Sequence, residues 1–377
     1  MFYPENKLID MKTVYLVDGK YFDFEANKPT IGGIQTYITD LLEVIKELGY
    51  KVILYVNDPL LRSVKYNDVF IRSYYFEEDN NKWEKVGLKV YSEMENKDSL
   101  VIYYSDEYVP LKTKFSNIIA IQHGIFWDKP SPQRNILRMM MSKLKFTYNV
   151  IRRMRMVTDI VCVDYNFINW YRTQVDSVEN NLIAIPNYTR ILPKIAKPDD
   201  KLNIVFARRM FWYRGTRVFT EAVISILNKY PDVLVTIAGE GPDEPYMREA
   251  LSCFKNVTFT SFLAEDSLNF HSDKHIAVVP TVGSEGTSLS LLEAMSSQCA
   301  VIASNVGGMT NIILDGYNGL LVEAGNSEQL YLAIEKLILD EELRNKLSDN
   351  AYETAKIAFS YERWALKWKE LLTNRAV

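Results

Sequence analysis

Two glutamates at a fixed separation are the residues whose types and spacing most suggest chemistry. Glu285 and Glu293 both stand in the segment GSEGTSLSLLEAMSSQCAV, residues 283–301. If the chain were helical between them, eight positions would turn it by about 800°, so both carboxylates would lie on nearly the same side. One carboxylate could then accept hydrogen bonds from a sugar and the other from a ribose, with phosphates between them.

The start of the helix predicted in this segment supplies a place for those phosphates. An apolar run ending at Pro280 predicts a buried strand, and Thr287 or Ser288 follows where a helix is capped. Free backbone N–H groups and the helix dipole at such a terminus attract anions. Open parallel sheets bind ligands at the carboxyl ends of their strands, which favours this function over two merely solvated glutamates.

Arginines follow the strand predicted at 203–207. Four arginines stand there in the segment ARRMFWYRGTR: Arg208 and Arg214, with Arg209 and Arg217 as alternatives. Two cations at a strand end could neutralise the charge that grows on a leaving diphosphate, although such a loop can also be simply solvated. The chain contains no Asp-x-Asp motif, so the sequence implies no metal ion.

A histidine and three glycines mark further strand ends. His123 follows a predicted buried strand, and the adjacent Gly32 and Gly33 separate the first strand from the first helix. Gly241 lies in the turn GEGP, residues 239–242. Lone histidines and glycine turns are more often structural, but adjacent glycines let the backbone approach a ligand closely. Their places at strand ends favour a ligand site.

The segment from Pro280 to Val322 resembles the retaining glycosyltransferases of family 4. The resemblance rests on Glu-x7-Glu with the following Ala-Met, on the pair Gly307-Gly308, and on Asp-Gly-x-x-Gly at 315–319. It extends over nearly the whole chain, dense from about residue 203 to residue 325 and sparse from 57 to 117.

By this resemblance each matching position has an implied role. Glu285 should hydrogen-bond hydroxyls of the donor sugar, and Glu293 should accept the ribose hydroxyls. His123 should lie near the sugar, and Gly241 near the base. The backbone groups that should meet the sugar or the diphosphate belong to Gly32, Gly33, Gly286, Thr287, Ser288 and Leu289.

The arginine segment departs from the family pattern. Arg208 matches the arginine of the pattern, but Ala207 replaces a glycine and Arg214 stands where a lysine is usual. Arginine keeps the charge and adds a planar fork of donors, but it is bulkier than lysine. The departure therefore affects positioning rather than charge.

As a whole, the resemblance implies an α/β protein of the GT-B fold, with two Rossmann-like domains whose parallel sheets face across a cleft. The implied reaction transfers a hexose from a UDP- or GDP-sugar to a hydroxyl of a saccharide or lipid-linked acceptor. It should retain anomeric configuration, need no metal ion or cofactor, and serve cell-surface polysaccharide synthesis. Rival interpretations are a nucleotide-sugar epimerase, a catalytically silent sugar-nucleotide-binding protein and a pyridoxal-phosphate phosphorylase.

Short apolar runs alternating with amphipathic helical patterns predict the elements that hold these residues. The predicted strands are 13–17, 51–56, 99–104, 117–122, 159–163 and 182–185, then 203–207, 234–238, 257–262, 276–280, 300–304 and 320–322. A proline-rich, charged segment near 191–202 predicts a linker. We therefore expect an acceptor domain over 1–195 and a donor domain over 201–359, with a helix at 360–377 packing back on the first.

Composition limits the class of protein. The net charge of −4 gives no general attraction to nucleic acid. Three widely spaced cysteines argue against a disulfide framework and favour buried thiols in a reducing compartment. No basic-then-apolar leader and no long apolar run occur, so we expect a cytoplasmic enzyme that could still lie on the inner face of the cell membrane.

One basic stretch has two interpretations. Residues 129–158 contain eight lysines and arginines, interleaved with apolar residues, and no acidic residue. Such a stretch could contact anionic lipid head groups, or it could be a basic face near an anionic substrate with its methionines in the core.

Overall fold

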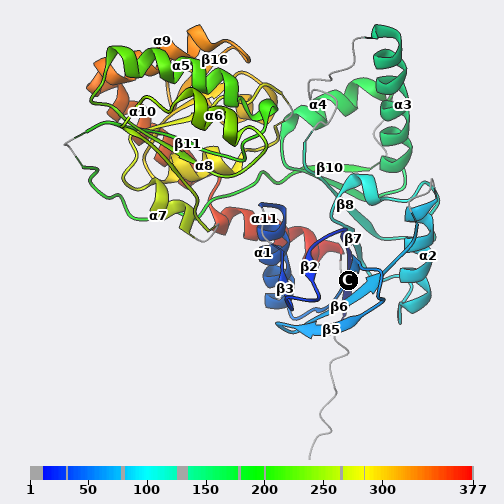
Figure 1. Ribbon diagram of the computed structural model, residues 1–377. Coiled ribbons are helices and arrows are strands. Elements are labelled where there is room, and N and C mark those ends of the chain that lie inside the picture. Colours follow the sequence, from blue (N-terminus) through cyan, green and yellow to red (C-terminus); the bar gives the residue numbers. More distant parts are fainter. Residues whose placement is uncertain are drawn as a thin grey trace, which may run out of the picture.

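Two β-sheets organise the protein. The computed structural model describes residues 12–30, 33–77, 81–124, 135–176, 180–198, 201–263, 266–283 and 285–375. Within these residues the first sheet has the strand order β10-β9-β8-β7-β1-β4-β6-β5 and the second β13-β12-β11-β14-β15-β16 (Figure 1). Neighbouring strands run parallel except β5 and β6, which form an antiparallel hairpin at one edge.

The first sheet agrees with the predicted strands except at this hairpin. Its strands are β1 (Thr13–Val17), β4 (Lys51–Asn57), β5 (Ser63–Tyr66), β6 (Val69–Tyr74), β7 (Val101–Tyr103), β8 (Ile118–Gln122), β9 (Asp159–Cys162) and β10 (Asn181–Ala184). A small separate ribbon pairs β2 (Phe22–Asp23) with β3 (Lys28–Pro29). Every residue of β7, β8 and β9 is buried, as expected for strands covered on both faces.

The second sheet follows its predicted strands closely. Its strands are β11 (Asn203–Ala207), β12 (Leu234–Ala238), β13 (Val257–Thr260), β14 (Ile276–Val279), β15 (Ala300–Ser304) and β16 (Leu320–Val322). Around it lie α5 (Thr216–Lys229), α6 (Glu244–Ala250), α7 (Ser267–His271), α8 (Leu289–Ser296), α9 (Ser327–Leu339) and α10 (Glu341–Ala358). Two short 3-10 helices, η3 (Trp212–Arg214) and η5 (Gly307–Asn311), occupy loops after β11 and β15.

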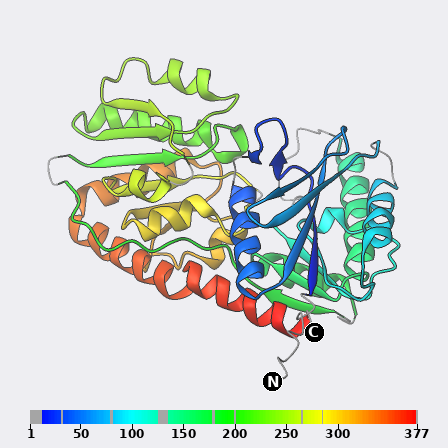
Figure 2. The ribbon, with the colours of Figure 1, turned by 90° about the horizontal axis from the view of Figure 1, so that it is seen from below.

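The helices around the first sheet come from both ends of the chain. They are α1 (Gly33–Glu47), α2 (Lys82–Glu93), the short η1 (Asp106–Tyr108), α3 (Ile136–Met154), α4 (Tyr165–Gln174) and the final α11 (Tyr361–Arg375). Figure 2 shows α11, in red, leaving the second half of the chain and lying beside α1, in blue. Residues 190–198 are neither helix nor strand, and the exact domain boundary there stays a prediction.

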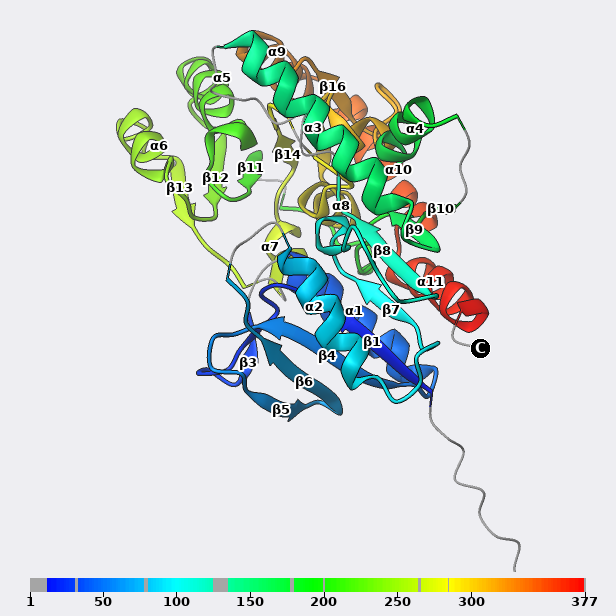
Figure 3. The same ribbon diagram turned by 90° about the vertical axis from the view of Figure 1, so that its right-hand side faces the viewer.

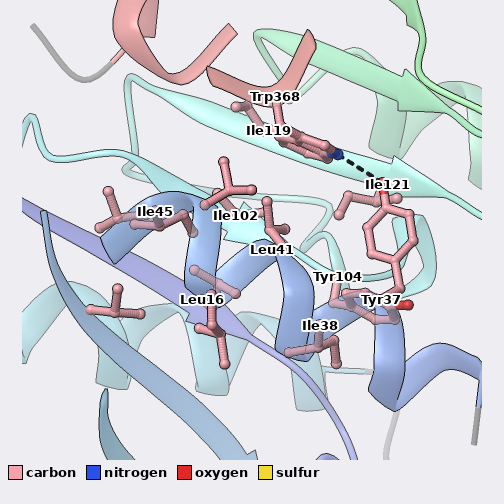
Figure 4. Packing of buried hydrophobic residues seen from close by; sticks show 14 of the residues in the cluster. Leu16, Tyr37, Ile38, Leu41, Ile45, Ile102, Tyr104, Ile119, Ile121 and Trp368 are labelled. Carbon is pink, nitrogen blue, oxygen red and sulfur yellow. Dashed lines mark hydrogen bonds between the residues drawn. The ribbon is translucent and has the colours of Figure 1, made fainter. Parts of the chain in front are cut away.

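Aromatic side chains of α11 complete the core of the first sheet. Trp364 and Trp368 are buried among residues of α1, β1 and β8, and the Trp368 indole N–H donates to the Tyr37 hydroxyl at 3.0 Å (Figure 4). Arg375 forms an ion pair of 2.6 Å with the fully buried Asp159 of β9. Truncating a buried tryptophan typically costs about 3–5 kcal/mol, so this helix is an integral part of the first sheet's core.

The cysteine prediction was wrong at one position. All three thiols are free, and Cys162 and Cys299 are buried, but Cys253 is exposed because it lies in a surface turn after α6. No helix within the described residues is long and apolar enough to cross a membrane.

Candidate functional site

A buried cluster of one carboxylate and two guanidinium groups lies at the carboxyl ends of β11 and β14. Arg208 donates from Nη2 to Oε2 of Glu285 at 2.6 Å, and Arg214 donates from Nη1 to the same oxygen. The Thr281 hydroxyl also donates to that oxygen, at 3.1 Å. The exposed fractions are 6% for Arg208, 18% for Arg214 and 10% for Glu285, so little water competes for these bonds.

The cluster carries a net positive charge. Burial opposes ionisation of Glu285, but the charges of Arg208 and Arg214 outweigh burial and hold its pKa below the ordinary value. Burial lowers the pKa of Arg208, yet a guanidinium stays protonated at any physiological pH. Two cations and one anion leave one positive charge in excess, which suits a polyanionic ligand such as a diphosphate.

The alternative arginines point elsewhere. The Arg209 guanidinium lies over the ring of Phe211, and that of Arg217 lies 5.2 Å from the ring centre of Tyr246. Arg214 reaches Glu285 because it ends η3, where Gly215 turns the chain with a φ of 83°.

The loop before α8 differs from the prediction in two ways. The helix begins at Leu289, so Glu285 lies outside it and the helical extrapolation that put Glu285 and Glu293 on one side was wrong. Ser288 stands at the capping position, but its side chain makes no capping hydrogen bond. The Thr287 hydroxyl does not cap either, because it donates to the carbonyl of Val163 beyond the end of β9. Neither of the two predicted capping residues therefore caps this terminus.

Glycines allow the loops of the two sheets to pack directly on one another. A Cβ atom on Gly286 would lie 2.9 Å from the carbonyl oxygen of His123 and 3.0 Å from Cγ2 of Val163. A Cβ on Gly33, the first residue of α1, would lie 2.7 Å from the side chain of Leu289. Gly33 and Gly286 thus both lie at the junction, where loops of one sheet pack on loops of the other. Gly32 lies outside the described residues.

The paired glycines after β15 support the same loop from the other side. Gly308 donates its N–H to the carbonyl of Glu285 at 2.8 Å. Gly307 has a φ of 53°, and any Cβ on it would collide with that same carbonyl. Only glycine fits here, so the pair fixes the backbone that carries Glu285.

His123 lies at the junction in its neutral form. Its Nε2 is 2.9 Å from the carbonyl oxygen of Tyr104, and its ring packs against the rings of Tyr104 and Tyr37. Since a carbonyl can only accept, Nε2 carries the proton and Nδ1 is left as an acceptor. Burial lowers the pKa of His123 to about 4. The imidazole therefore brings no positive charge to the site at neutral pH.

Glu293 and Gly241 lie on other elements of the second half. Glu293 is on α8, where burial raises its pKa to about 7 and the Ser267 hydroxyl of α7 is a polar neighbour that opposes this rise. Gly241 lies in the turn after β12, packed so closely on the carbonyl of Met210 that a side chain would clash.

Asp164 is a carboxylate of this junction that the sequence reasoning missed. Its Oδ1 accepts from the N–H groups of Asn166 and Phe167 and so caps α4. Its Oδ2 is buried without a hydrogen-bond partner and lies 3.3 Å from the place a Cβ on Gly286 would occupy. Burial raises the pKa of Asp164. A signal existed in the sequence, since an aspartate between a buried strand and a helix is a typical N-cap at a strand end.

The second half of the chain matches a known protein family. Residues 187–354 match the family described as "Glycosyl transferases group 1". An uncharacterized glycosyltransferase of Methanocaldococcus jannaschii is 25% identical over 89% of this chain and 92% of its own length.

Solved structures match nearly the whole chain. Sucrose-phosphate synthase from Thermosynechococcus elongatus superposes with a TM-score of 0.75 at 18% identity, over 96% of this chain and 98% of that one. HepE of Anabaena, determined in complex with UDP, gives a TM-score of 0.72 at 15% identity, over 97% and 100% of the two chains. Residues 187–354 are therefore similar to a glycosyl transferases group 1 domain, and the chain as a whole has the GT-B fold.

Proposed function

We propose that the protein transfers a hexose from a nucleoside-diphosphate sugar, UDP- or GDP-linked, to a hydroxyl of a saccharide or lipid-linked acceptor, with retention of anomeric configuration. The observation that carries this proposal is the convergence of Arg208 and Arg214 on Glu285 beside the start of α8, where neither Thr287 nor Ser288 forms a capping hydrogen bond. UDP in the HepE structure supports a uridine donor by analogy of fold alone.

The leaving diphosphate is the group for which the cations are suited. Breaking the glycosidic bond moves negative charge onto the phosphate oxygens, and Arg208 and Arg214 lie in a buried setting where that charge is strongly stabilised. The N–H groups of the first turn of α8 add the positive end of a helix dipole. In the described part of the chain no three His, Cys, Asp or Glu side chains could hold a metal ion together, so the arginines are our candidates for that role.

Glu285 and Glu293 have separate tasks in this proposal. Glu285 is ionised and holds the sugar through its hydroxyls, while Glu293 accepts the hydroxyls of the ribose. The neutral His123, with Nδ1 free to accept, would position the sugar or the incoming hydroxyl rather than supply charge. Gly32, Gly33, Leu289 and Gly241 would border the donor through their backbones.

Retention is proposed through reaction on one face of the sugar. The Glu285 oxygen is held by two arginines and a threonine, which reduces its strength as a nucleophile. One oxygen of Asp164 is committed to capping α4. The departing diphosphate oxygen can instead take the proton of the incoming hydroxyl, so that the protein supplies positioning and electrostatic stabilisation.

The test needs no knowledge of the acceptor. The protein is mixed with UDP-, GDP-, dTDP- and ADP-hexoses, and slow hydrolysis of the donor is followed by proton NMR, which reports the first anomer formed. We expect the donor's own anomer, and loss of hydrolysis in Arg208→Ala but not in Arg248→Ala, which breaks an exposed ion pair. Release of the inverted anomer would refute retention. A donor sugar epimerised in place would refute transfer, and so would equal turnover in both variants.

A further inference from the structure

The surface of α3 carries an apolar stripe that the described residues of the protein leave uncovered. Its members are 55–70% exposed, far more than large apolar residues in a packed helix: Ile136, Leu137, Met140, Met141, Leu144 and Tyr148. At 100° per residue these six positions fall within an arc of about 140° centred near Leu144. They form one continuous face, which we call the α3 stripe.

Two residues in the last turns of α3, which project beside the Ile136 border of the stripe, hold the helix onto the protein. Val150 and Met154 are buried in the core on the outer face of the first sheet, and the helix packs against η1. Only the second half of α3 is anchored in this way, since residues 136–138 and 140–145 are all exposed. Figure 1 shows the far end of α3 standing clear of the sheet, and Figure 3 shows the helix on the outer side of the molecule. The stripe is therefore not needed for the core.

Basic residues lie along both borders of the stripe. Arg138, Lys145 and Arg152 project at about 160–200° in the same helical projection, along one border, and Lys143 lies on the other. No acidic residue occurs between 129 and 158, although the chain as a whole carries a net charge of −4. Apolar residues edged by cations on one helix face are the arrangement that binds the interface of an anionic bilayer.

We propose that α3 docks on an anionic lipid surface, with the α3 stripe among the acyl chains and its basic borders on the head-group phosphates. Charge selects this occupant over a second copy of the chain, because two α3 helices packed on each other would bring rows of arginine and lysine together. The apolar and the electrostatic contributions are both needed, since each basic residue raises the partition coefficient onto such a surface only about fivefold.

The docking has a consequence that rests on the proposed function. β8 ends at the residue before His123, and α3 begins only thirteen residues after His123, so the helix follows directly from the acceptor side of the junction. A protein held on a bilayer by this segment would meet lipid-linked acceptors at high local concentration. This favours the lipid-linked acceptor over the soluble saccharide.

Vesicle sedimentation tests the docking by itself. Full-length protein is spun with vesicles of phosphatidylcholine alone or mixed with phosphatidylglycerol, and the bound fraction is measured at low and high salt. We expect binding only to the mixed vesicles, weakened by salt. The charge variant Arg138→Glu, Lys145→Glu, Arg152→Glu should bind at least a hundredfold more weakly, and so should the apolar variant Met140→Gln, Met141→Gln, Leu144→Gln.

Matched controls separate docking from general surface effects. Lys346→Glu with Lys356→Glu reverses exposed charges on α10, and Leu332→Gln with Leu339→Gln replaces exposed leucines on α9. These variants should bind like the unaltered protein. Absence of binding to mixed vesicles, or equal loss in the controls, would overturn the proposal. So would a dimer in sedimentation equilibrium that the apolar variant dissociates, because α3 would then join two copies.

Donor hydrolysis distinguishes this inference from the proposed function. The α3 stripe belongs to a helix of the first sheet, whereas the arginine cluster lies at the ends of β11 and β14 in the second, so every α3 variant should hydrolyse the nucleotide sugar at the rate of the unaltered protein. If docking fails while hydrolysis persists, the membrane proposal alone is wrong. If docking holds while no donor is turned over, the transferase proposal alone is wrong.

Discussion

Replacing Glu285 by glutamine should strengthen nucleotide binding while it weakens catalysis. The glutamine amide keeps the shape of the side chain but removes the negative charge between two guanidinium groups that are 6% and 18% exposed. Breaking a buried ion pair by removing one partner costs about 3–5 kcal/mol, because the remaining charge is left uncompensated. The unliganded variant Glu285→Gln should therefore be less stable than the unaltered protein.

A diphosphate should recover part of that loss. In the unaltered protein the phosphates of UDP must share Arg208 and Arg214 with the carboxylate of Glu285, whereas in the variant both cations lack an anionic partner. One charge-assisted hydrogen bond contributes about 1.5–3 kcal/mol, which corresponds to UDP binding about tenfold to a hundredfold more tightly. Sugar transfer should fall by about a hundredfold, because the donor hydroxyls lose their ionised acceptor.

Isothermal titration calorimetry with UDP measures this change directly. Glu244→Gln is the matched control, since it removes the same charge from an exposed pair with Arg248 on α6, and its UDP affinity should not change. Unchanged or weaker binding of UDP to Glu285→Gln would refute the reasoning, because the arginines would then not be the diphosphate site. Tighter binding with normal turnover would refute the assignment of Glu285 to the sugar.

Three further predictions follow from the same geometry. Affinity for a UDP-sugar should rise about tenfold from pH 6 to pH 8, because the pKa of Glu293 in the free protein is about 7 and the ribose prefers its ionised form. Calorimetry should show this rise abolished in Glu293→Gln but kept in Asp106→Asn, which removes another buried carboxyl whose pKa is also about 7. The opposite pattern would assign the pH dependence to Asp106 instead of Glu293. Gly286→Ala should raise KM for the donor at least tenfold, since its Cβ would press on His123, whereas Gly87→Ala, with 3.5 Å of room, should be neutral in the same assay. Initial rates of transfer should be unchanged by EDTA, and a loss restored by added Mg²⁺ would refute the metal-free proposal.

Ionisation of Glu293 also has a defined effect on stability. Burial disfavours its charged form, so the folded free protein holds this proton to higher pH than the unfolded chain does. Stability from this group is therefore greatest below the ordinary pKa of a glutamate and falls as pH rises toward 7. Donor binding, which favours the ionised form, should offset that fall.

The sequence predicted the sheets well because their signal is local. Strands β11, β12, β15 and β16 have the predicted bounds, since buried parallel strands are uninterrupted apolar runs between polar turns. The hairpin of β5 and β6 was missed because an edge strand alternates in burial and its signal is weaker.

The sequence predicted which residues belong to the candidate site but not which of them contact one another. Nothing in the spacing of Arg208, Arg214 and Glu285 shows that both arginines bind one carboxylate oxygen, because that depends on how β11 and β14 lie side by side. The predicted capping of α8 was wrong because the Thr287 hydroxyl donates instead to the carbonyl of Val163, which lies 124 positions away in the chain. Such long-range competition for a hydrogen bond leaves no local pattern.

The return of α11 to the first sheet constrains how the protein can fold as it is made. Trp364 and Trp368 complete a core whose other members begin at Val14, more than three hundred residues earlier. The first half therefore leaves the ribosome with part of its apolar surface uncovered until α11 has been synthesised. Contacts between residues so far apart in the sequence form slowly. We expect the second sheet, whose core is assembled from consecutive segments, to fold before the first despite being synthesised later.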